Sequence, residues 1–231
     1  MEKYGPRVLV TGGSRGIGRA VVLELAARGA RIFATGRDEG LLAELAASAG
    51  CRVGAFDLAE PEAPARLYEA AKRELGGFPE ILVNNAGFNA RKSPALEIEA
   101  GELDAQYAVN LRAPILLCRE AMRDMAAARR GRIVNVVSTT ALFANETMGV
   151  YTAMKTGLRG FTTVLQKEAR QYGVKVLGIY PGGVDTEFRA NPRPDYLRPE
   201  SAARLIVDAI YAPEDAVIHE LVFRPLVESN F

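Results

Sequence analysis

Thr11-Gly12-Gly13-Ser14-Arg15-Gly16-Ile17-Gly18 is the most informative segment of this sequence, because it connects an apolar run (residues 7–10) to an amphipathic stretch (16–28). A glycine-rich turn between a strand and a helix lets backbone N–H groups approach a pyrophosphate at the positive end of the helix dipole. Side chains at the glycines would obstruct that approach. Three glycines alone are a weak signal, and the spacing is T-G-x-x-x-G-x-G rather than G-x-G-x-x-G. Their position predicts a dinucleotide site that includes Gly12, Ser14, Arg15, Gly16, Ile17 and Gly18.

The rest of the chain alternates between two kinds of segment. Short apolar runs, expected to be strands, cover residues 7–10, 31–35, 51–57, 80–84, 132–137, 175–180 and 217–223. Amphipathic stretches, expected to be helices, cover 16–28, a segment capped by Asp38, 61–75, 100–128, 149–172 and 199–211. This alternation predicts an α/β fold: one doubly wound, mainly parallel sheet (a Rossmann fold) of seven strands with helices on both faces. We expect residues 1–231 to form a single dinucleotide-binding and catalytic domain.

Composition excludes several classes of function. The 29 basic and 28 acidic residues give a net charge of +1, which favours neither nucleic acid nor membrane as a partner. His219 is the only histidine, so zinc sites with several histidine ligands are excluded and no metal is expected. Cys51 and Cys118 form no disulfide framework, which predicts a cytoplasmic protein.

The end of the second predicted strand bears on the choice of dinucleotide. NAD sites place an acidic residue there to bind the ribose 2′-hydroxyl, whereas this chain has Gly36 followed by Arg37. A guanidinium suits a 2′-phosphate, and Arg15 could reach the same group. In the alternative interpretation Arg37 is a solvated loop residue and Asp38 binds the ribose. Asp38 is better used as a helix cap, so we expect NADP(H).

Further motifs follow in a fixed order. They are Asp57, Asn84-Asn85-Ala86-Gly87, Asn110, Ser138, Tyr151 with Lys155, and Pro181-Gly182-Gly183-Val184-Asp185-Thr186. With them the sequence resembles the short-chain dehydrogenase/reductase family, of the NADP-preferring type, over nearly the whole chain. Y-x-x-x-K alone is frequent by chance, but the full set in register is specific.

Tyr151 and Lys155 are one helical turn apart on a predicted helix, so both face the same way. A free tyrosine has a pKa of about 10, and a nearby ammonium lowers it. The pair is therefore a candidate acid/base unit for a carbonyl oxygen. The resemblance implies that Lys155 also binds the nicotinamide ribose, and that Ser138 hydrogen-bonds the substrate oxygen. Taken alone, Tyr151 would be interpreted as a packing residue.

Asn110 is the fourth candidate catalytic residue. Pro114, four residues later, has no N–H, so the Asn110 carbonyl loses its usual helical partner and the helix should kink. The resemblance implies that this carbonyl holds a water in a proton relay to Lys155. The alternative is that Pro114 only bends a long helix around the core.

The resemblance also extends the cofactor site. It assigns Asp57 to the adenine, Asn84 to the turn flooring the site, and Thr186 to the nicotinamide carboxamide; Asp57 could instead cap a turn near Pro61. The remaining cofactor residues expected are Leu58, Ala86, Gly87, Arg37, Tyr151, Lys155, Pro181, Gly182 and Val184.

Two segments bear on the substrate. The resemblance implies that residues 187–198 form a lid over the substrate, and the shortness of this segment predicts an open or shallow pocket. Five apolar residues are expected either to line this pocket or to belong to the core: Phe88, Leu142, Phe143, Met148 and Phe188. Two arginines, Arg189 and Arg193, are expected either to attract an acidic substrate or to be solvated. Residues 217–225 resemble sepiapterin reductases and 3-hydroxy acid dehydrogenases more than 3-oxoacyl-carrier-protein reductases. His219 is expected on the last strand without a catalytic part.

The leading hypothesis is an NADPH-dependent carbonyl reductase, reversible as an alcohol dehydrogenase, that acts on a small or medium carbonyl or alcohol. The alternatives are a 3-oxoacyl-carrier-protein reductase and a non-catalytic NADP(H)-binding regulator. Apolar residues on the helices around Asn110 and Tyr151 hint at a helix-mediated dimer, and the resemblance implies a homotetramer or homodimer.

Overall fold

The computed structural model describes residues 5–89, 91–188 and 191–229. Within them, seven strands form one sheet in the order β3-β2-β1-β4-β5-β6-β7, and all neighbours run parallel. The strands are β1 Arg7–Thr11, β2 Arg31–Gly36, β3 Arg52–Ala55, β4 Ile81–Asn84, β5 Gly131–Val136, β6 Val174–Pro181 and β7 Glu220–Phe223. The doubly wound α/β fold predicted from the sequence is confirmed.

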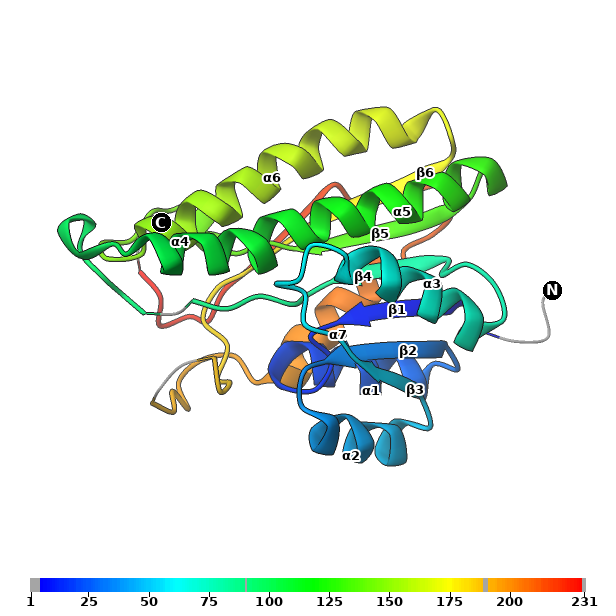
Figure 1. Cartoon of the computed structure of the whole chain (residues 1–231), viewed down its shortest axis with the longest axis horizontal. Helices are drawn as coiled ribbons and strands as arrows, with labels where there is room; N and C mark the ends of the chain where they lie inside the picture. The colour runs from blue at the N-terminus through cyan, green and yellow to red at the C-terminus, as the bar shows by residue number, and fades with distance from the viewer. Residues whose placement is uncertain (1–4, 90, 189–190, 230–231) are drawn as a thin grey trace.

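Helices alternate with these strands along the chain (Figure 1). The α-helices are α1 Gly16–Ala27, α2 Glu39–Ala49, α3 Ala63–Leu75, α4 Ala100–Tyr107, α5 Ala113–Ala128, α6 Gly149–Arg170 and α7 Pro199–Ile210. Two 3-10 helices, η1 Ala95–Glu97 and η3 Thr139–Ala141, and one π-helix, η2 Ala108–Arg112, complete the described elements.

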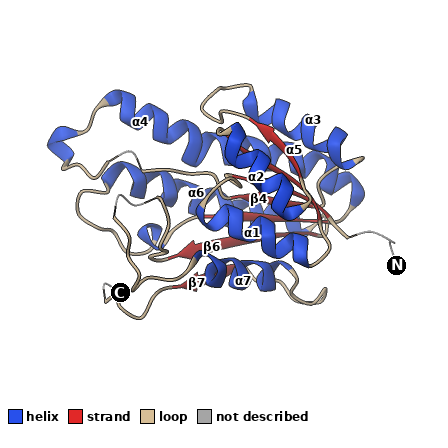
Figure 2. Cartoon of the chain, turned by 90° about the horizontal axis from the view of Figure 1, so that it is seen from below, coloured by secondary structure: helices blue, strands red, loops and turns tan. Residues whose placement is uncertain are grey.

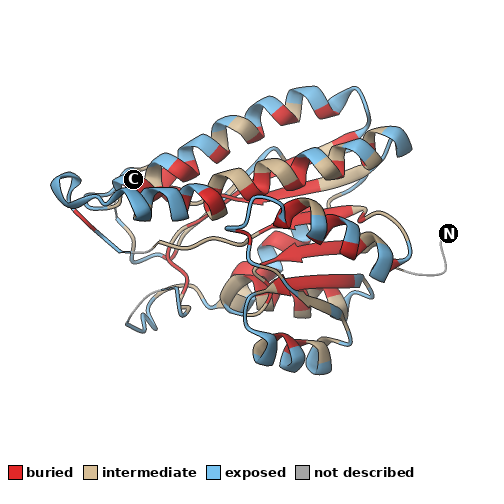
Figure 3. Cartoon of the chain, in the orientation of Figure 1, coloured by how far each residue is buried: buried red, intermediate tan, exposed pale blue. Residues whose placement is uncertain are grey.

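Apolar side chains of β1 point alternately to the two faces of the sheet. Val8 and Val10 pack in one cluster with α1, α2 and α7, whereas Leu9 packs in another with α3, α5 and α6. Figure 2 shows α1 and α7 in front of the strands, and Figure 3 shows the buried strands between helices whose outer faces are exposed. Burial on both faces explains why the central strands are apolar throughout.

The two edge strands are shorter than predicted. The run 51–57 gives only Arg52–Ala55, and 217–223 gives only Glu220–Phe223. Each pairs with a single neighbour over four residues, β3 with β2 and β7 with β6. His219 therefore lies just before β7, exposed, and its carbonyl oxygen accepts the Gly178 amide.

The chain reverses its winding direction between β1 and β4. From β1 it proceeds outward to β2 and β3, and β4 then returns to the other side of β1. The helices that follow β1 and β4 pack on opposite faces of the sheet, and this reversal of winding marks a crevice at the carboxyl ends of the strands.

Candidate active site

The glycine-rich loop after β1 is held tightly against the loop after β4. The Thr11 hydroxyl accepts the amides of Asn85 and Ala86, each at 3.0 Å, and the Asn85 side chain donates to the carbonyls of Thr11 and Gly12. A Cβ at Gly12 (φ 65°) would lie 2.8 Å from Ala86 Cα. A Cβ at Gly18 would lie 2.0 Å from the Gly12 carbonyl oxygen. The glycines are therefore required by packing as well as by backbone conformation.

A cavity of about 1080 Å³ begins at this loop and continues across the carboxyl ends of the strands. The predicted residues that line it are Gly12, Ser14, Arg15, Gly16, Ile17, Gly18, Arg37, Asp57, Leu58, Ala86, Gly87, Ser138, Tyr151, Lys155, Pro181, Gly182, Val184 and Thr186. Asn84 and Asn110 are not among the lining residues. The fold thus brings most of the predicted site together in one cavity.

At one end of the cavity, the loop after β2 carries Arg37 and Asp38. Asp38 caps α2, since its carboxylate accepts the Leu41 amide at 3.1 Å, and it pairs with Arg15 at 2.9 Å. These two contacts, the Leu41 amide first, lower the pKa of the Asp38 carboxyl. The prediction that Asp38 is a helix cap is confirmed. Asp57 lines the cavity, as a contact with the adenine requires, and it also accepts the Ala59 amide, as a turn cap does. Its contact with the adenine stays a prediction.

Gly36, at the end of β2, packs against the side chain of Ser14. A Cβ at this position would lie 2.6 Å from the Ser14 hydroxyl oxygen. Ser14 therefore occupies the region that the side chain of an acidic residue at the end of β2 would enter.

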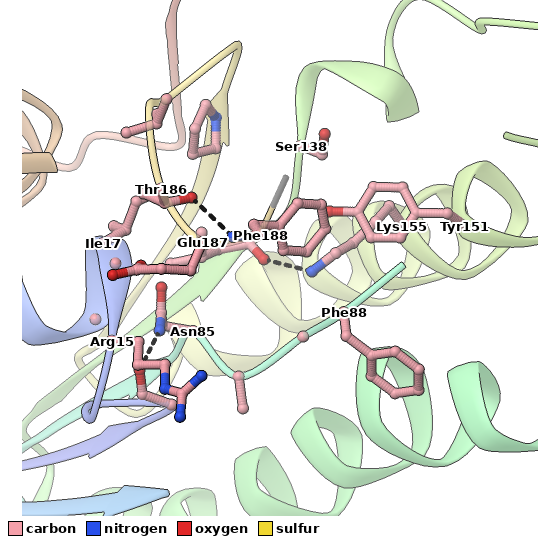
Figure 4. A pocket seen from close by; sticks show the side chains of 18 of the residues that line it. Arg15, Ile17, Asn85, Phe88, Ser138, Tyr151, Lys155, Thr186, Glu187 and Phe188 are labelled. Carbon is pink, nitrogen blue, oxygen red and sulfur yellow. Dashed lines mark hydrogen bonds between the residues drawn. The ribbon is translucent and has the colours of Figure 1, made fainter. Parts of the chain in front are cut away.

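At the other end of the cavity, α6 presents Tyr151 and Lys155 (Figure 4). Lys155 is 3% exposed; its Nζ donates to the Val136 carbonyl at 2.9 Å and lies 5.7 Å from the centroid of the Tyr151 ring. Burial lowers the pKa of Lys155 to about 8. Ser138, which begins the η3 turn after β5, faces the same cavity, and its Oγ accepts the Thr140 amide.

Asn110 lies outside the cavity lining and holds the loop after β4, which does line it. Its side chain is fully buried, donates to the Phe88 carbonyl at 2.8 Å and accepts the Phe88 amide at 3.1 Å. A Cβ at Gly87 would lie 2.7 Å from Asn110 Oδ1 and 3.3 Å from Lys155 Nζ. Asn110 thus fixes the loop after β4 close to Lys155.

The helix expected over residues 100–128 is interrupted next to Pro114. The π-helix η2 separates α4 from α5, and the Ala113 amide donates to the Ala108 carbonyl, five residues earlier. Because Pro114 cannot donate a hydrogen bond, the register of the helix shifts around it. A π segment is present at the point where a kink was predicted, and the kink itself stays a prediction. The role of the Asn110 carbonyl stays a prediction.

Asn84 ends β4 and leads into the turn that lines the cavity, but its own side chain does not line it. Its buried side chain turns toward α5 and β5, where it donates to Asn135 Oδ1 at 2.9 Å and contacts Cys118 Sγ at 3.3 Å. Successive residues of a strand point to opposite faces, so Asn85 faces the glycine loop instead. Asn85, which was not among the predicted site residues, lines the cavity, and the role of Asn84 in the cofactor site stays a prediction.

Residues 6–197 match the family model described as short chain dehydrogenase. The chain belongs to the short-chain dehydrogenase/reductase family. A relative from Sinorhizobium fredii, the uncharacterized short-chain type dehydrogenase/reductase y4eK, is 30% identical over 94% of this chain and 90% of its own length.

Solved structures of this family share the fold. A metagenomic short-chain oxidoreductase in complex with NADP is 32% identical, with a TM-score of 0.84 over 97% of this chain and 99% of its own. A short chain dehydrogenase from Burkholderia cenocepacia in complex with NADP is 30% identical, with a TM-score of 0.82 over 95% of this chain and 96% of its own.

In this short-chain dehydrogenase/reductase, some of the apolar residues expected to line a substrate pocket line the cavity. Phe88, Met148 and Phe188 line it, whereas Leu142 and Phe143 do not. The Phe188 ring packs 5.8 Å from the Tyr151 ring at an angle of 57°. Arg193 is exposed and pairs with Asp195, and Arg189 lies outside the described residues.

Several lining residues were not predicted. Tyr196 precedes α7, and Arg224, Val227, Glu228 and Ser229 follow β7. No sequence motif identifies these residues, because they lie in irregular segments that approach the cavity only in the folded chain. In the described ranges, no helix is long and apolar enough to cross a membrane, and no cluster of potential metal ligands occurs.

Proposed function

We propose that this protein is an NADPH-dependent carbonyl reductase, reversible as an alcohol dehydrogenase, that acts on a small or medium substrate with Tyr151 as its acid/base. The observation that carries the proposal is the single cavity that Ser138, Tyr151, Lys155 and the glycine-rich loop line together. An acid/base tyrosine next to a nucleotide loop suits the transfer of a hydride and a proton to a carbonyl.

The residues present fit NADP(H). The N-cap of α1 at Arg15 has no side-chain hydrogen bond, so the first amides of the helix face a region suited to a pyrophosphate. Arg15 and Arg37 line the end of the cavity beyond β2, where Gly36 replaces an acid. The NADP complexes of the two family members described above support the same choice. When bound, the nicotinamide supplies the hydride for the substrate carbonyl carbon.

Proton transfer falls to the residues of α6. Tyr151 donates its hydroxyl proton to the carbonyl oxygen of the substrate, and the protonated Lys155 stabilises the phenolate that this leaves. Ser138 donates a hydrogen bond to the same substrate oxygen and orients it. In the reverse direction, the Tyr151 phenolate accepts the proton of an alcohol.

A carbonyl panel assayed with NADPH and with NADH tests this proposal. We expect turnover with NADPH in preference to NADH. Including a 3-oxoacyl thioester tests the carrier-protein alternative, which needs a basic surface near the cavity. Two arginines of the loops after β6 and β7 are paired with carboxylates, Arg193 with Asp195 and Arg224 with Glu228, whereas Lys92 also lines the cavity. NADPH binding without turnover on any substrate would favour the regulator and contradict the proposed reductase.

We also propose that the protein is cytoplasmic and assembles as a homodimer or homotetramer through α4, α5 and α6. Large apolar side chains are exposed on this side: Leu103 and Tyr107 on α4 and Val164 on α6. Light scattering on the purified protein tests the assembly, and a monomeric mass would contradict it.

A further inference from the structure

The chain continues past β7 as a C-terminal tail (residues 224–229) that returns to the cavity; it is the red segment that ends at the C label in Figure 1. Arg224, Val227, Glu228 and Ser229 of this tail line the cavity. The tail therefore contacts the site without carrying any of the motifs assigned to it.

Glu228 joins the tail to the loop after β6. One carboxylate oxygen, Oε1, accepts the Gly183 amide at 2.9 Å, and the other, Oε2, accepts Arg224 Nε at 3.0 Å. The two charged side chains are 16% and 9% exposed, so this ion pair is largely screened from water. A charged acceptor in such surroundings makes a stronger hydrogen bond than a neutral one.

Gly183 is held on its opposite side as well. A Cβ at this position would lie 2.2 Å from the Tyr196 ring and 2.9 Å from Glu228 Oε1. The Gly183 carbonyl accepts the Leu197 amide at 3.2 Å, and the Gly182 amide donates to the Phe223 carbonyl at 2.8 Å. Three separate segments thus meet on one dipeptide, and a Cβ at Gly183 would clash with the Tyr196 ring.

The held dipeptide leads directly into residues that line the cavity. Val184 and Thr186 follow it, and Val184 forms an isolated parallel bridge with Leu197. Arg224 also lies over the Phe143 ring, with 5.1 Å between the guanidinium carbon and the ring centroid. Phe143 follows η3, the turn that Ser138 begins. The tail therefore contacts the segments on both sides of the substrate space.

We infer that Glu228 is a positioning residue that, through Gly183, orients the loop of residues 182–186 toward the nicotinamide half of the dinucleotide. The inference rests on the proposed function. Although Glu228 lines the cavity, the inferred effect passes through the backbone of the loop, because its carboxylate oxygens accept the Gly183 amide and Arg224 Nε. If the ion pair only stabilised the tail, its loss would not change the affinity for the whole dinucleotide relative to the affinity for its adenosine half.

Binding of two ligands separates these roles. NADPH uses both halves of the site, whereas adenosine 2′,5′-bisphosphate reaches only the half near Arg37. In Glu228→Ala we expect the Kd for NADPH to rise about tenfold, the loss of one hydrogen bond to a charged group. The Kd for the bisphosphate should stay at the wild-type value. Glu228→Gln keeps an oxygen for the Gly183 amide and should recover most of the NADPH affinity.

Hydrogen–deuterium exchange without cofactor follows the loop directly. Exchange across residues 182–186 should increase in Glu228→Ala, much less in Glu228→Gln, and not in Leu226→Ala, a tail variant whose side chain is fully exposed. Exchange in β5 should stay at the wild-type level in all three, which shows that the variants are folded.

The outcomes distinguish the two proposals. A wild-type protein that binds neither ligand refutes the proposed function and the inference with it. A wild type that binds both, with a Glu228→Ala variant that loses affinity for both equally or for neither, refutes the inference alone. Loss confined to NADPH, together with faster exchange in the loop, supports it.

Discussion

The Lys155 ammonium nitrogen lies 5.7 Å from the centroid of the Tyr151 ring, one helical turn away on α6. The same nitrogen donates to the Val136 carbonyl at the end of β5. The sheet thereby holds the lysine, and the lysine lies beside the tyrosine. The spacing of the two residues is local in sequence, but the hydrogen bond that fixes the lysine comes from a strand 19 residues earlier.

Burial of Lys155 gives the stability of the protein a defined pH dependence. Its pKa falls from 10.5 to about 8 on folding, because burial disfavours the charged form. Between these values the unfolded chain holds more protons than the folded one, so stability rises with pH in that window.

We expect the unfolding free energy of wild type minus that of Lys155→Met to increase from pH 7 to pH 10, measured by urea denaturation. Lys167→Met, on the exposed face of α6, provides the control. A difference that falls with pH would contradict the burial argument.

Gly18 tests the packing of the nucleotide loop. Gly18→Ala places a Cβ 2.0 Å from the Gly12 carbonyl and 2.3 Å from Asn85 Nδ2, both in the contact between β1 and β4. We expect a loss of stability of about 1–3 kcal/mol or more, with loss of NADPH binding.

Gly160→Ala is the matched control for this glycine. No atom lies within 4 Å of a Cβ at Gly160 on α6, so alanine should stabilise the helix by about 0.5–1 kcal/mol. Thermal unfolding measures both variants. Equal melting temperatures for the two would contradict the steric account of the loop.

Asn110 is expected to stabilise the loop after β4. Asn110→Ala leaves the half-buried amide and carbonyl of Phe88 without their side-chain partner, at a cost of about 1–3 kcal/mol. Asn110→Asp keeps the acceptor for the amide but offers no donor to the carbonyl, and should be no more stable than the alanine variant. Urea denaturation measures the order, and an aspartate variant as stable as wild type would show that the Phe88 contacts are unimportant.

Arg37 should discriminate between the two cofactors. Arg37→Ala removes a guanidinium from the 2′-phosphate end of the proposed site, so we expect the Kd for NADPH to rise about tenfold or more. The Kd for NADH, which has no such phosphate, should not change. Arg52→Ala, on β3, removes an exposed arginine of the same sheet edge and serves as the control. Equal losses for NADPH and NADH would contradict this role.

Local signals in the sequence were sufficient for much of the fold. Strand and helix periodicity placed all the strands, and the residues after each strand predicted where the cavity would form. The Asp38 cap was predictable because its partner, the Leu41 amide, is three residues away. The ends of β3 and β7 were not, since each edge strand pairs with one neighbour only and the apolar runs continue past the paired residues.

Long-range contacts account for what sequence reasoning missed. Which of Asn84 and Asn85 faces the cavity depends on the pleat of β4. The approach of Glu228 to Gly183 joins residues 45 positions apart through an irregular tail. Neither relationship follows from periodicity, and both required the packed structure.

Tyr151→Phe tests the central claim most directly, because it removes one hydroxyl and retains the ring that packs against Phe188. NADPH consumption on a carbonyl substrate and NADPH binding by fluorescence titration are measured for the variant and for wild type. The account predicts that turnover falls by about 10²–10⁴-fold or more while the affinity for NADPH stays close to that of wild type. A variant that turns over at the wild-type rate would contradict Tyr151 as the proton donor.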